Sequence, residues 1–274
     1  MAVSMADIQK LRKMTGAGMM DCKNALNEAE GDFDKSIEII RKKGQAFAAK
    51  RGDREASEGC VLAAAKDGYA AIVSLNCETD FVAMNADYIA LTKSILEAGV
   101  AGKPANLDAL KALKIGDSTI EELVVDRMGV SGEKMELSTY LSVTAPTVFA
   151  YVHPGNKLAA IVGFNKAGVA EEVAKDIAMQ IAAMSPVAID ESGVTEDIKE
   201  RELKIAREKA QAEGKPENLL DRISEGALNK FYKDFTLLKQ DFVKNPKQSI
   251  AQYLAAADKD LKVVDFKRFT LNAE

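Results

Sequence analysis

An internal duplication in the middle of the chain restricts its possible folds more than any other feature of the sequence. The segment Tyr69–Asn76 parallels Leu158–Asn165, and every aligned pair lies 89 positions apart. The first copy follows an apolar segment and the turn Lys66-Asp67-Gly68, and the second follows an apolar segment and the turn His153-Pro154-Gly155-Asn156. Apolar runs joined by short turns of this kind are typical of β-hairpins. The duplication therefore predicts two halves, each built on an antiparallel hairpin.

A helix and further strands complete the predicted core. An amphipathic helix is expected after each hairpin, at Ile89–Thr92 in the first half and at Ile177–Gln180 in the second. Met135–Val143 predicts a further strand, which we assign to the second half, and Val264–Leu271 predicts a closing strand. The expected fold class is α+β, with a duplicated core of two α+β subdomains and antiparallel sheets.

The two halves differ in the loop after the repeated strand. The second half has Lys166–Val169, a short loop that leads directly into a helix. The first half has Cys77–Val82, which is longer and contains an aromatic residue. Because the scaffold is repeated and only this loop is enlarged, we expect the loop to meet a partner.

The N-terminal residues predict a small helical module. A first helix carries Ile8, Leu11 and Met14 on one face, and a second helix extends over Met19–Ala29. Asp32 is a suitable N-cap for a third helix, which we expect to end near Gly44. From Gln45 to Gly59 the sequence has no periodicity, which predicts a linker.

A helical hairpin is predicted near the C-terminus. Thr195–Ala212 is a charged helix that ends before the turn Gly214-Lys215-Pro216. A second helix follows, with one apolar stripe formed by Leu220, Ile223, Ala227, Phe231 and Phe235. The pattern indicates an antiparallel hairpin of two helices with a thin apolar seam. The predicted organisation is a three-helix module (1–45), a linker (46–58), a core N-subdomain (59–132), a core C-subdomain (133–190 and 236–274) and a coiled-coil hairpin (191–235).

Composition excludes several classes of function. With 37 Lys+Arg against 42 Asp+Glu, the net charge of −5 is unfavourable for a domain that binds phosphate backbones, so no direct nucleic-acid partner is expected. Three cysteines without a CxxC pair and a single histidine do not form a standard zinc site, so no metal or cofactor is expected. The N-terminus lacks a secretory signal, and no apolar run is long enough to span a bilayer. We therefore expect a reduced cytoplasmic protein without a membrane partner.

Few residues suggest catalysis. Gly16-Ala17-Gly18 precedes a helix, but it lacks the strand and lysine of a phosphate loop, so a helix–helix turn is the better interpretation. A Cys77–His153 nucleophile pair is conceivable, although a lone free cysteine is more often a small buried hydrophobe. We expect no catalytic residue and no enzyme.

Three apolar side chains have both a structural and a functional interpretation. On pattern alone Met19 belongs to the core, while Met20 is equally suited to the core or to a partner contact. Phe81 follows an acidic residue in a loop. The residues alone favour Thr79 or Asp80 as a helix cap, with Phe81 packed in the core.

Three motifs, taken together, resemble bacterial elongation factor Ts. They are Thr15–Lys23 (TGAGMMDCK), Asn76–Val82 (NCETDFV), and Gly214-Lys215-Pro216 with Glu225-Gly226 and Phe231 downstream. The resemblance extends in order over essentially the whole chain. It implies a ubiquitin-associated-like (UBA-like) three-helix module, a two-subdomain core and an inserted antiparallel coiled coil.

The resemblance also implies a function in protein biosynthesis, as guanine-nucleotide exchange factor for the GTPase elongation factor Tu. In that family the loop matching Thr79, Asp80, Phe81 and Val82 enters the GTPase near its Mg²⁺ site, which reverses the core interpretation of Phe81. Further partner-binding positions match Arg12, Met19, Met20 and His153. The implied partner is elongation factor Tu, GDP-bound and nucleotide-free, and a dimer through the coiled coil is possible.

Two alternatives belong to other classes. The chain could be a non-catalytic docking module or scaffold that binds a GTPase or a nascent chain without promoting exchange. An enzyme that uses Cys77 as its nucleophile is a weaker alternative.

Overall fold

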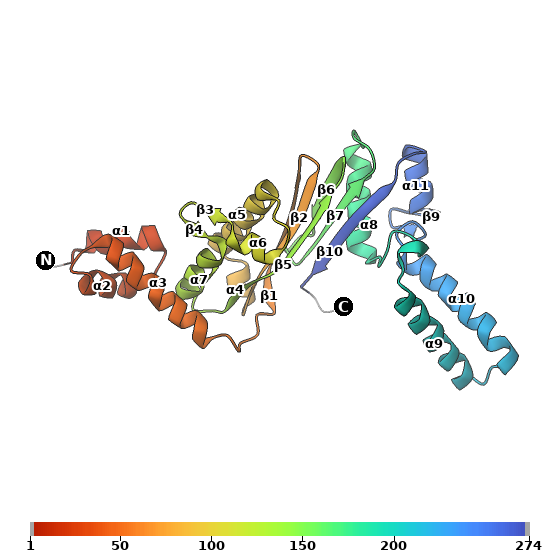
Figure 1. Cartoon of the computed structure of the whole chain (residues 1–274), viewed down its shortest axis with the longest axis horizontal. Helices are drawn as coiled ribbons and strands as arrows, with labels where there is room; N and C mark the ends of the chain where they lie inside the picture. The colour runs from red at the N-terminus through yellow and green to blue at the C-terminus, as the bar shows by residue number, and fades with distance from the viewer. Residues whose placement is uncertain (1–2, 272–274) are drawn as a thin grey trace.

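The computed structural model describes residues 3–271 and is elongated. A helical module, a core of strands covered by helices and a helical hairpin follow one another along its longest axis (Figure 1). Separate small antiparallel sheets combined with segregated helices make this an α+β fold, as predicted. Within residues 3–271, no helix is both long enough and apolar enough to cross a bilayer.

The N-terminal module has the three predicted helices, α1 (Met5–Thr15), α2 (Met19–Glu28) and α3 (Phe33–Lys50). Ser4 begins α1 with a capping box, and Asp32 caps α3 as predicted. Gly16 ends α1 in the left-handed conformation (φ 70°), so Gly16-Ala17-Gly18 is a helix–helix turn. The small core of the module is formed by Ile8, Leu11, Ala17, Cys22, Ala25 and Leu26.

The third helix is longer than the sequence pattern predicts. It continues past Gly44 to Lys50, so the expected linker is helical over its first residues, and the first strand begins at Glu58. The extension is stabilised by tertiary contacts, because Phe47 and Ala48 pack against the core of the first half. Gly44 permits a close helix crossing. A Cβ built on Gly129 of α7 (Ile120–Ser131) would lie 3.0 Å from the Gly44 Cα.

The duplication is visible in two three-stranded antiparallel sheets. In each sheet the repeated strand is central, between its hairpin partner and a third strand that arrives later in the chain. The first sheet has the order β1 (Glu58–Lys66), β2 (Tyr69–Cys77), β5 (Met135–Thr144), and the second has the order β10 (Val263–Thr270), β7 (Leu158–Phe164), β6 (Thr147–Val152).

The assignment of Met135–Val143 to the second half was wrong. This strand is β5, and it pairs with β2 of the first half, with Leu137 opposite Leu75 and Val143 opposite Ala70. The pairing buries Met135 and Leu137 in the core of the first half. Strand β5 therefore completes the first sheet as β10 completes the second.

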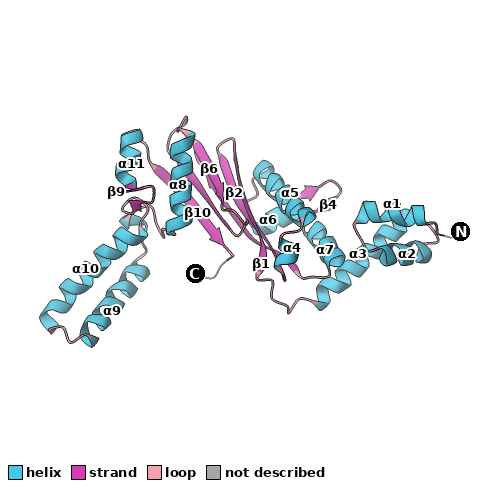
Figure 2. Cartoon of the chain, turned by 180° about the vertical axis from the view of Figure 1, so that it is seen from behind, coloured by secondary structure: helices cyan, strands magenta, loops and turns pink. Residues whose placement is uncertain are grey.

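The two sheets pack face to face, and helices cover their outer faces (Figure 2). On β2, Ile72 points to the other sheet, where it meets Ile161 of β7. Its neighbours Val73 and Leu75 belong to the cluster under the helices. The covering helices and the remaining small elements of the two halves are α4 (Asp80–Ala83), α5 (Ala86–Gly102), α6 (Leu107–Ala112), β3 (Lys114–Ile115), β4 (Ser118–Thr119), α8 (Glu171–Met184), η1 (Glu191–Gly193), β8 (Asp241–Phe242), β9 (Asn245–Ser249) and α11 (Ile250–Ala257).

The helical hairpin consists of α9 (Glu196–Ala212) and α10 (Glu217–Phe235), which pack side by side. Its seam differs from the predicted stripe. Leu220 is buried as expected, but Ala227 is exposed and the Phe235 side chain is 42% exposed. The buried positions of α10 are spaced by four and eight residues, which places them on one helical face. They are Leu220, Ser224 and Tyr232.

Candidate functional site

The enlarged loop of the first half forms a single helical turn that presents an aromatic side chain. Helix α4 has four residues, and Thr79 is its N-cap, with its hydroxyl accepting from the Val82 N–H at 3.4 Å. The turn packs inward through Val82 and Ala83. Phe81 points away from the core and is 82% exposed. The cap prediction for Thr79 is confirmed, whereas the core interpretation of Phe81 from the residues alone was wrong.

The N-terminal end of this turn is held by Glu133, which lies between α7 and β5. One carboxylate oxygen accepts from the Thr79 N–H at 3.0 Å, and the other accepts from the Thr79 hydroxyl at 2.6 Å. Charge-assisted hydrogen bonds of this kind are stronger than neutral ones. The turn is thus attached to a segment more than fifty positions away in sequence.

A second carboxylate, Glu78, joins the loop to the end of the N-terminal module. It accepts from the Lys134 N–H at 2.6 Å and pairs with Arg51 at 2.7 Å and Arg54 at 3.0 Å. The Lys134 N–H, helped by the two guanidinium groups, lowers the pKa of Glu78 to about 2. Because Arg51 and Arg54 directly follow α3, the loop and the module share one polar network.

The Cys77–His153 nucleophile pair is not supported by the structure. The Cys77 thiol is buried and donates to the Thr79 carbonyl at 3.2 Å. Burial raises the pKa of Cys77 to about 11, which keeps the thiol protonated and weakly nucleophilic. His153 is exposed, and its Nδ1 lies 3.0 Å from the hydroxyl of Tyr151.

The turn that carries His153 lies at the same end of the first sheet as the loop. The Val61 N–H donates to the Asn156 carbonyl at 2.7 Å, and Lys157 pairs with Glu58 at 2.9 Å. Glu58 raises the pKa of Lys157, and the charge of Asp80 adds a smaller contribution in the same direction. The structure thus brings the β6–β7 turn of the second half close to the α4 turn of the first.

The three predicted contact residues of the N-terminal module are all exposed. Arg12 lies on α1, while Met19 and Met20 begin α2 with exposed fractions of 41% and 65%. The pattern-based placement of Met19 in the core was wrong. Ala17 is buried in its place, and α2 buries Cys22 on its inner face. These side chains lie in the module, separate from the α4 turn.

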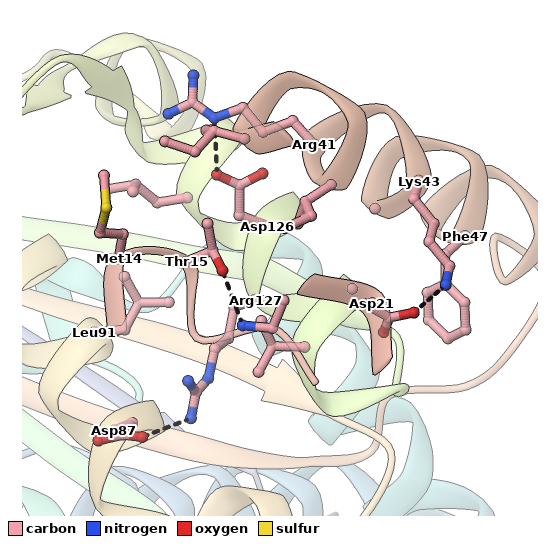
Figure 3. Close-up of a pocket in the computed structure, with 17 residues that line it drawn as sticks. Met14, Thr15, Asp21, Arg41, Lys43, Phe47, Asp87, Leu91, Asp126 and Arg127 are labelled. Carbon is pink, nitrogen blue, oxygen red and sulfur yellow. Dashed lines mark hydrogen bonds and ion pairs between the residues drawn. The ribbon is translucent and has the colours of Figure 1, made fainter. Parts of the chain in front are cut away.

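A cavity of about 440 Å³ lies between the module and the first half (Figure 3). Its charged residues pair with one another, as Arg41 with Asp126 at 3.6 Å, Arg127 with Asp87 at 3.6 Å, and Lys43 with Asp21. Burial raises the pKa of Asp126. Within the described part of the chain, the buried Nε of Arg127 has no hydrogen-bond partner. The cavity is therefore the seam along which the module docks on α7.

Sequence reasoning missed Glu133, and it recorded Glu78 only as part of the Asn76–Val82 motif, without a role. Both are common surface residues in a chain with 42 acidic side chains, so neither type nor spacing distinguishes them. Glu133 contacts Thr79, and Glu78 contacts Arg51 and Arg54. Each of these partners is remote in sequence from the glutamate that it contacts. Only covariation between distant positions could have indicated these contacts. Across residues 3–271, no group of three or more His, Cys, Asp or Glu side chains forms a candidate metal site.

Comparisons with known proteins point to one family. The family model described as Elongation factor TS matches residues 78–273. The chain is 60% identical to elongation factor Ts of Porphyromonas gingivalis ATCC 33277 over 275 residues, with 100% of both chains covered. It is 56% identical to elongation factor Ts of Azobacteroides pseudotrichonymphae over 274 residues, again with 100% of both covered.

A more distant relative agrees. Elongation factor Ts of Bacteroides thetaiotaomicron is 47% identical over 331 aligned positions that cover 100% of each chain. The model match includes the α4 turn and its Glu133 anchor, and the full-length matches include the N-terminal module. The resemblance inferred from the three motifs is confirmed. The chain therefore belongs to the elongation factor Ts family.

Proposed function

We propose that the Thr79–Val82 turn drives GDP release from elongation factor Tu, with Phe81 as an apolar wedge and Asp80 as a carboxylate that acts beside the Mg²⁺ site of the partner. Membership in the elongation factor Ts family makes the chain a nucleotide exchange factor for elongation factor Tu in translation elongation. The single observation that supports the proposed role of the turn is Phe81, 82% exposed on a capped helical turn. An isolated aromatic ring held in water in this way is suited to burial in a partner.

An exchange factor accelerates release by binding the nucleotide-free partner more tightly than the nucleotide-bound partner. The coupling is reciprocal, so binding of the factor weakens GDP binding by the same ratio. Each tenfold loss of GDP affinity corresponds to about 1.4 kcal/mol. Burying one aromatic side chain contributes roughly 1.5–3 kcal/mol. Phe81 alone can therefore account for one to two orders of magnitude of this coupling.

We assign the other predicted positions to binding rather than to nucleotide release. Arg12, Met19 and Met20 are exposed on the module, and His153 is exposed on the β6–β7 turn. Each is outside the α4 turn, so their contacts with elongation factor Tu are expected to set affinity and orientation. No covalent step is needed, which agrees with the buried, protonated thiol of Cys77.

The test is release of fluorescent GDP from elongation factor Tu, chased with excess unlabelled GDP, with the chain added at substoichiometric amounts. Strong acceleration by the unaltered chain and a large loss in Phe81→Ala are expected. Phe235→Ala is the matched control, because Phe235 is a 42% exposed phenylalanine on the helical hairpin. Near-normal exchange by folded Phe81→Ala would refute the wedge. Tight complex formation without acceleration by the unaltered chain would instead indicate a docking protein.

A further inference from the structure

The orientation of the α4 turn depends on a contact that the turn itself does not supply. A helix of four residues is far shorter than an isolated helix that persists in water. Its inward apolar contacts are those of Val82 and Ala83. What constrains its first residue is the Glu133 carboxylate, with one oxygen 3.0 Å from the Thr79 amide nitrogen and the other 2.6 Å from its hydroxyl.

The hydroxyl of Thr79 is used both as a donor and as an acceptor. A threonine hydroxyl has one proton to donate and lone pairs to accept with. Its proton goes to Glu133, which leaves the oxygen free to accept from the Val82 N–H at 3.4 Å. Glu133 therefore fixes the side-chain rotamer in which Thr79 caps the helix that carries Phe81.

Glu133 is itself well supported. It lies just after Gly132, which ends α7 in the left-handed conformation (φ 75°), and its N–H donates to the Ser131 hydroxyl at 3.2 Å. The next residue, Lys134, donates its N–H to Glu78 at 2.6 Å. The short α7–β5 connection is thus hydrogen-bonded both to the end of α7 and to Glu78 in the loop after β2.

We propose that Glu133 is a positioning residue for nucleotide exchange, which acts through Thr79 to hold the Phe81-bearing turn in its binding-competent orientation. This inference rests on the proposed function of the turn. A turn that is already ordered loses less conformational freedom when it enters the partner. Without the hydrogen bonds between Glu133 and Thr79, the turn adopts several orientations. Only the molecules whose turn has the binding-competent orientation promote GDP release.

The experiment is a double-mutant cycle between Glu133→Gln and Phe81→Ala in the full chain. Glutamine keeps the shape of the side chain but removes its charge, and its amide NH₂ can only donate, so the Thr79 hydroxyl loses its carboxylate acceptor and the contacts that remain are neutral. GDP release is followed by stopped flow at rising concentrations of each variant, to separate the maximal rate from the half-saturating concentration. Glu121→Gln, which makes the same charge change at an exposed position of α7, is the matched control.

We expect Glu133→Gln to lower the maximal release rate about tenfold, the size expected when charge-assisted hydrogen bonds are replaced by neutral ones. Glu121→Gln should leave the rate unchanged. In the Phe81→Ala background, Glu133→Gln should reduce the rate by less than about twofold, because the side chain it positions is gone.

Two outcomes would overturn the proposal. One is an unchanged rate for Glu133→Gln in the unaltered background. The other is an equal fractional loss with and without Phe81, since Glu133 would then act independently of the turn. Normal exchange by Phe81→Ala would defeat the proposed function itself, whereas a defective Phe81→Ala beside a normal Glu133→Gln would defeat only the positioning role.

Stability is monitored by thermal unfolding of each variant. If Glu133→Gln lowers Tm by more than about 5 °C, Glu133→Asp replaces it in the cycle, since it keeps the charge and withdraws it by one methylene group. Amide hydrogen exchange of the isolated protein gives an independent readout. Glu133→Gln should speed exchange at residues 80–84 and leave the rest of the first half unchanged, and uniform acceleration would contradict a local role.

Discussion

The two halves of the core share a plan but use the loop after the repeated strand in opposite ways. In the second half, Asn165 bonds back to its own half, donating to the Asp260 carbonyl at 2.9 Å and accepting from the Lys262 N–H at 2.8 Å. Lys166 pairs with Asp258 at 2.6 Å, and Val169 packs on the local core. In the first half, carboxylates hold the loop from outside while Phe81 projects into solvent.

The comparison shows that one copy of a duplicated scaffold can present an aromatic side chain to solvent where the other copy has a loop without one. Loop closure by local polar contacts stabilises the second half and leaves no large apolar group exposed in that loop. The same position in the first half exposes a ring, which contributes nothing to folding and is available to a partner. Truncating an apolar side chain in the first loop should therefore slow GDP release and leave stability unchanged. Truncating one in the second loop should lower stability and leave GDP release unchanged.

The largest expected effect comes from comparing two truncations, one in the loop of each half. Phe81→Ala should slow GDP release from elongation factor Tu by about 30-fold, as expected for one lost buried ring, and change the free energy of unfolding by less than about 0.5 kcal/mol. Val169→Ala should leave release within about twofold and destabilise the protein by about 1 kcal/mol, because Val169 is half-buried. Exchange kinetics and urea unfolding of both variants check this. A functional loss in Val169→Ala would remove the contrast.

The next effect concerns acid stability. The pKa of Glu78 is lowered from 4.5 to about 2 in the folded chain, so its stabilisation is present above pH 4.5 and is lost as the pH falls toward 2. Because Arg54 is largely exposed to water, we expect Glu78→Gln to cost only about 1 kcal/mol at pH 7. This difference should shrink progressively below pH 4.5.

Urea unfolding between pH 7 and pH 3 measures this dependence. Asp258→Asn is the comparison in the second half, since hydrogen bonding to Lys166 lowers the pKa of Asp258 at an exposed site. We expect Glu78→Gln, unlike Asp258→Asn, also to increase proteolysis at residues 51–57, where the module joins the core. Equal protection of that segment in both variants would show that Glu78 does not fix the module.

A smaller effect is expected at Cys77, whose counterpart in the second half is Lys166. Cys77→Ser should leave GDP release within about twofold and destabilise the fold by about 1–2 kcal/mol, because a hydroxyl replaces a buried thiol. The folded protein should also react slowly with thiol reagents at pH 8, since the pKa of Cys77 is raised to about 11. Abolished exchange in folded Cys77→Ser would revive the thiol as a functional group.

The smallest expected signal is self-association through the helical hairpin. The hairpin exposes Ile205, Leu219 and Phe235, each at least 40% exposed, so weak pairing of two copies is a reasonable prediction. Sedimentation equilibrium over a wide concentration range, with Ile205→Glu as comparison, measures it. Concentration-independent monomer behaviour of the unaltered chain would exclude the dimer.

Local patterns in the sequence predicted most of the elements. Apolar runs joined by short turns predicted the central strands Tyr69–Asn76 and Leu158–Asn165, and helical periodicity predicted α5 and α8. Cap chemistry predicted Asp32 at the start of α3 and Thr79 or Asp80 at the start of α4, where Thr79 is the cap. These signals are local, because a strand repeats every two residues and a cap bonds only three residues away.

The sequence by itself determined the duplication, the hairpins, the helices and the family, since each is written in short-range spacing or in motif residues. The tertiary structure alone decided that Met135–Thr144 joins the first sheet and that α3 continues to Lys50. It also decided that Glu133 meets Thr79. These outcomes depend on which surfaces pack together across tens of residues, and periodicity carries no information about the identity of a distant partner.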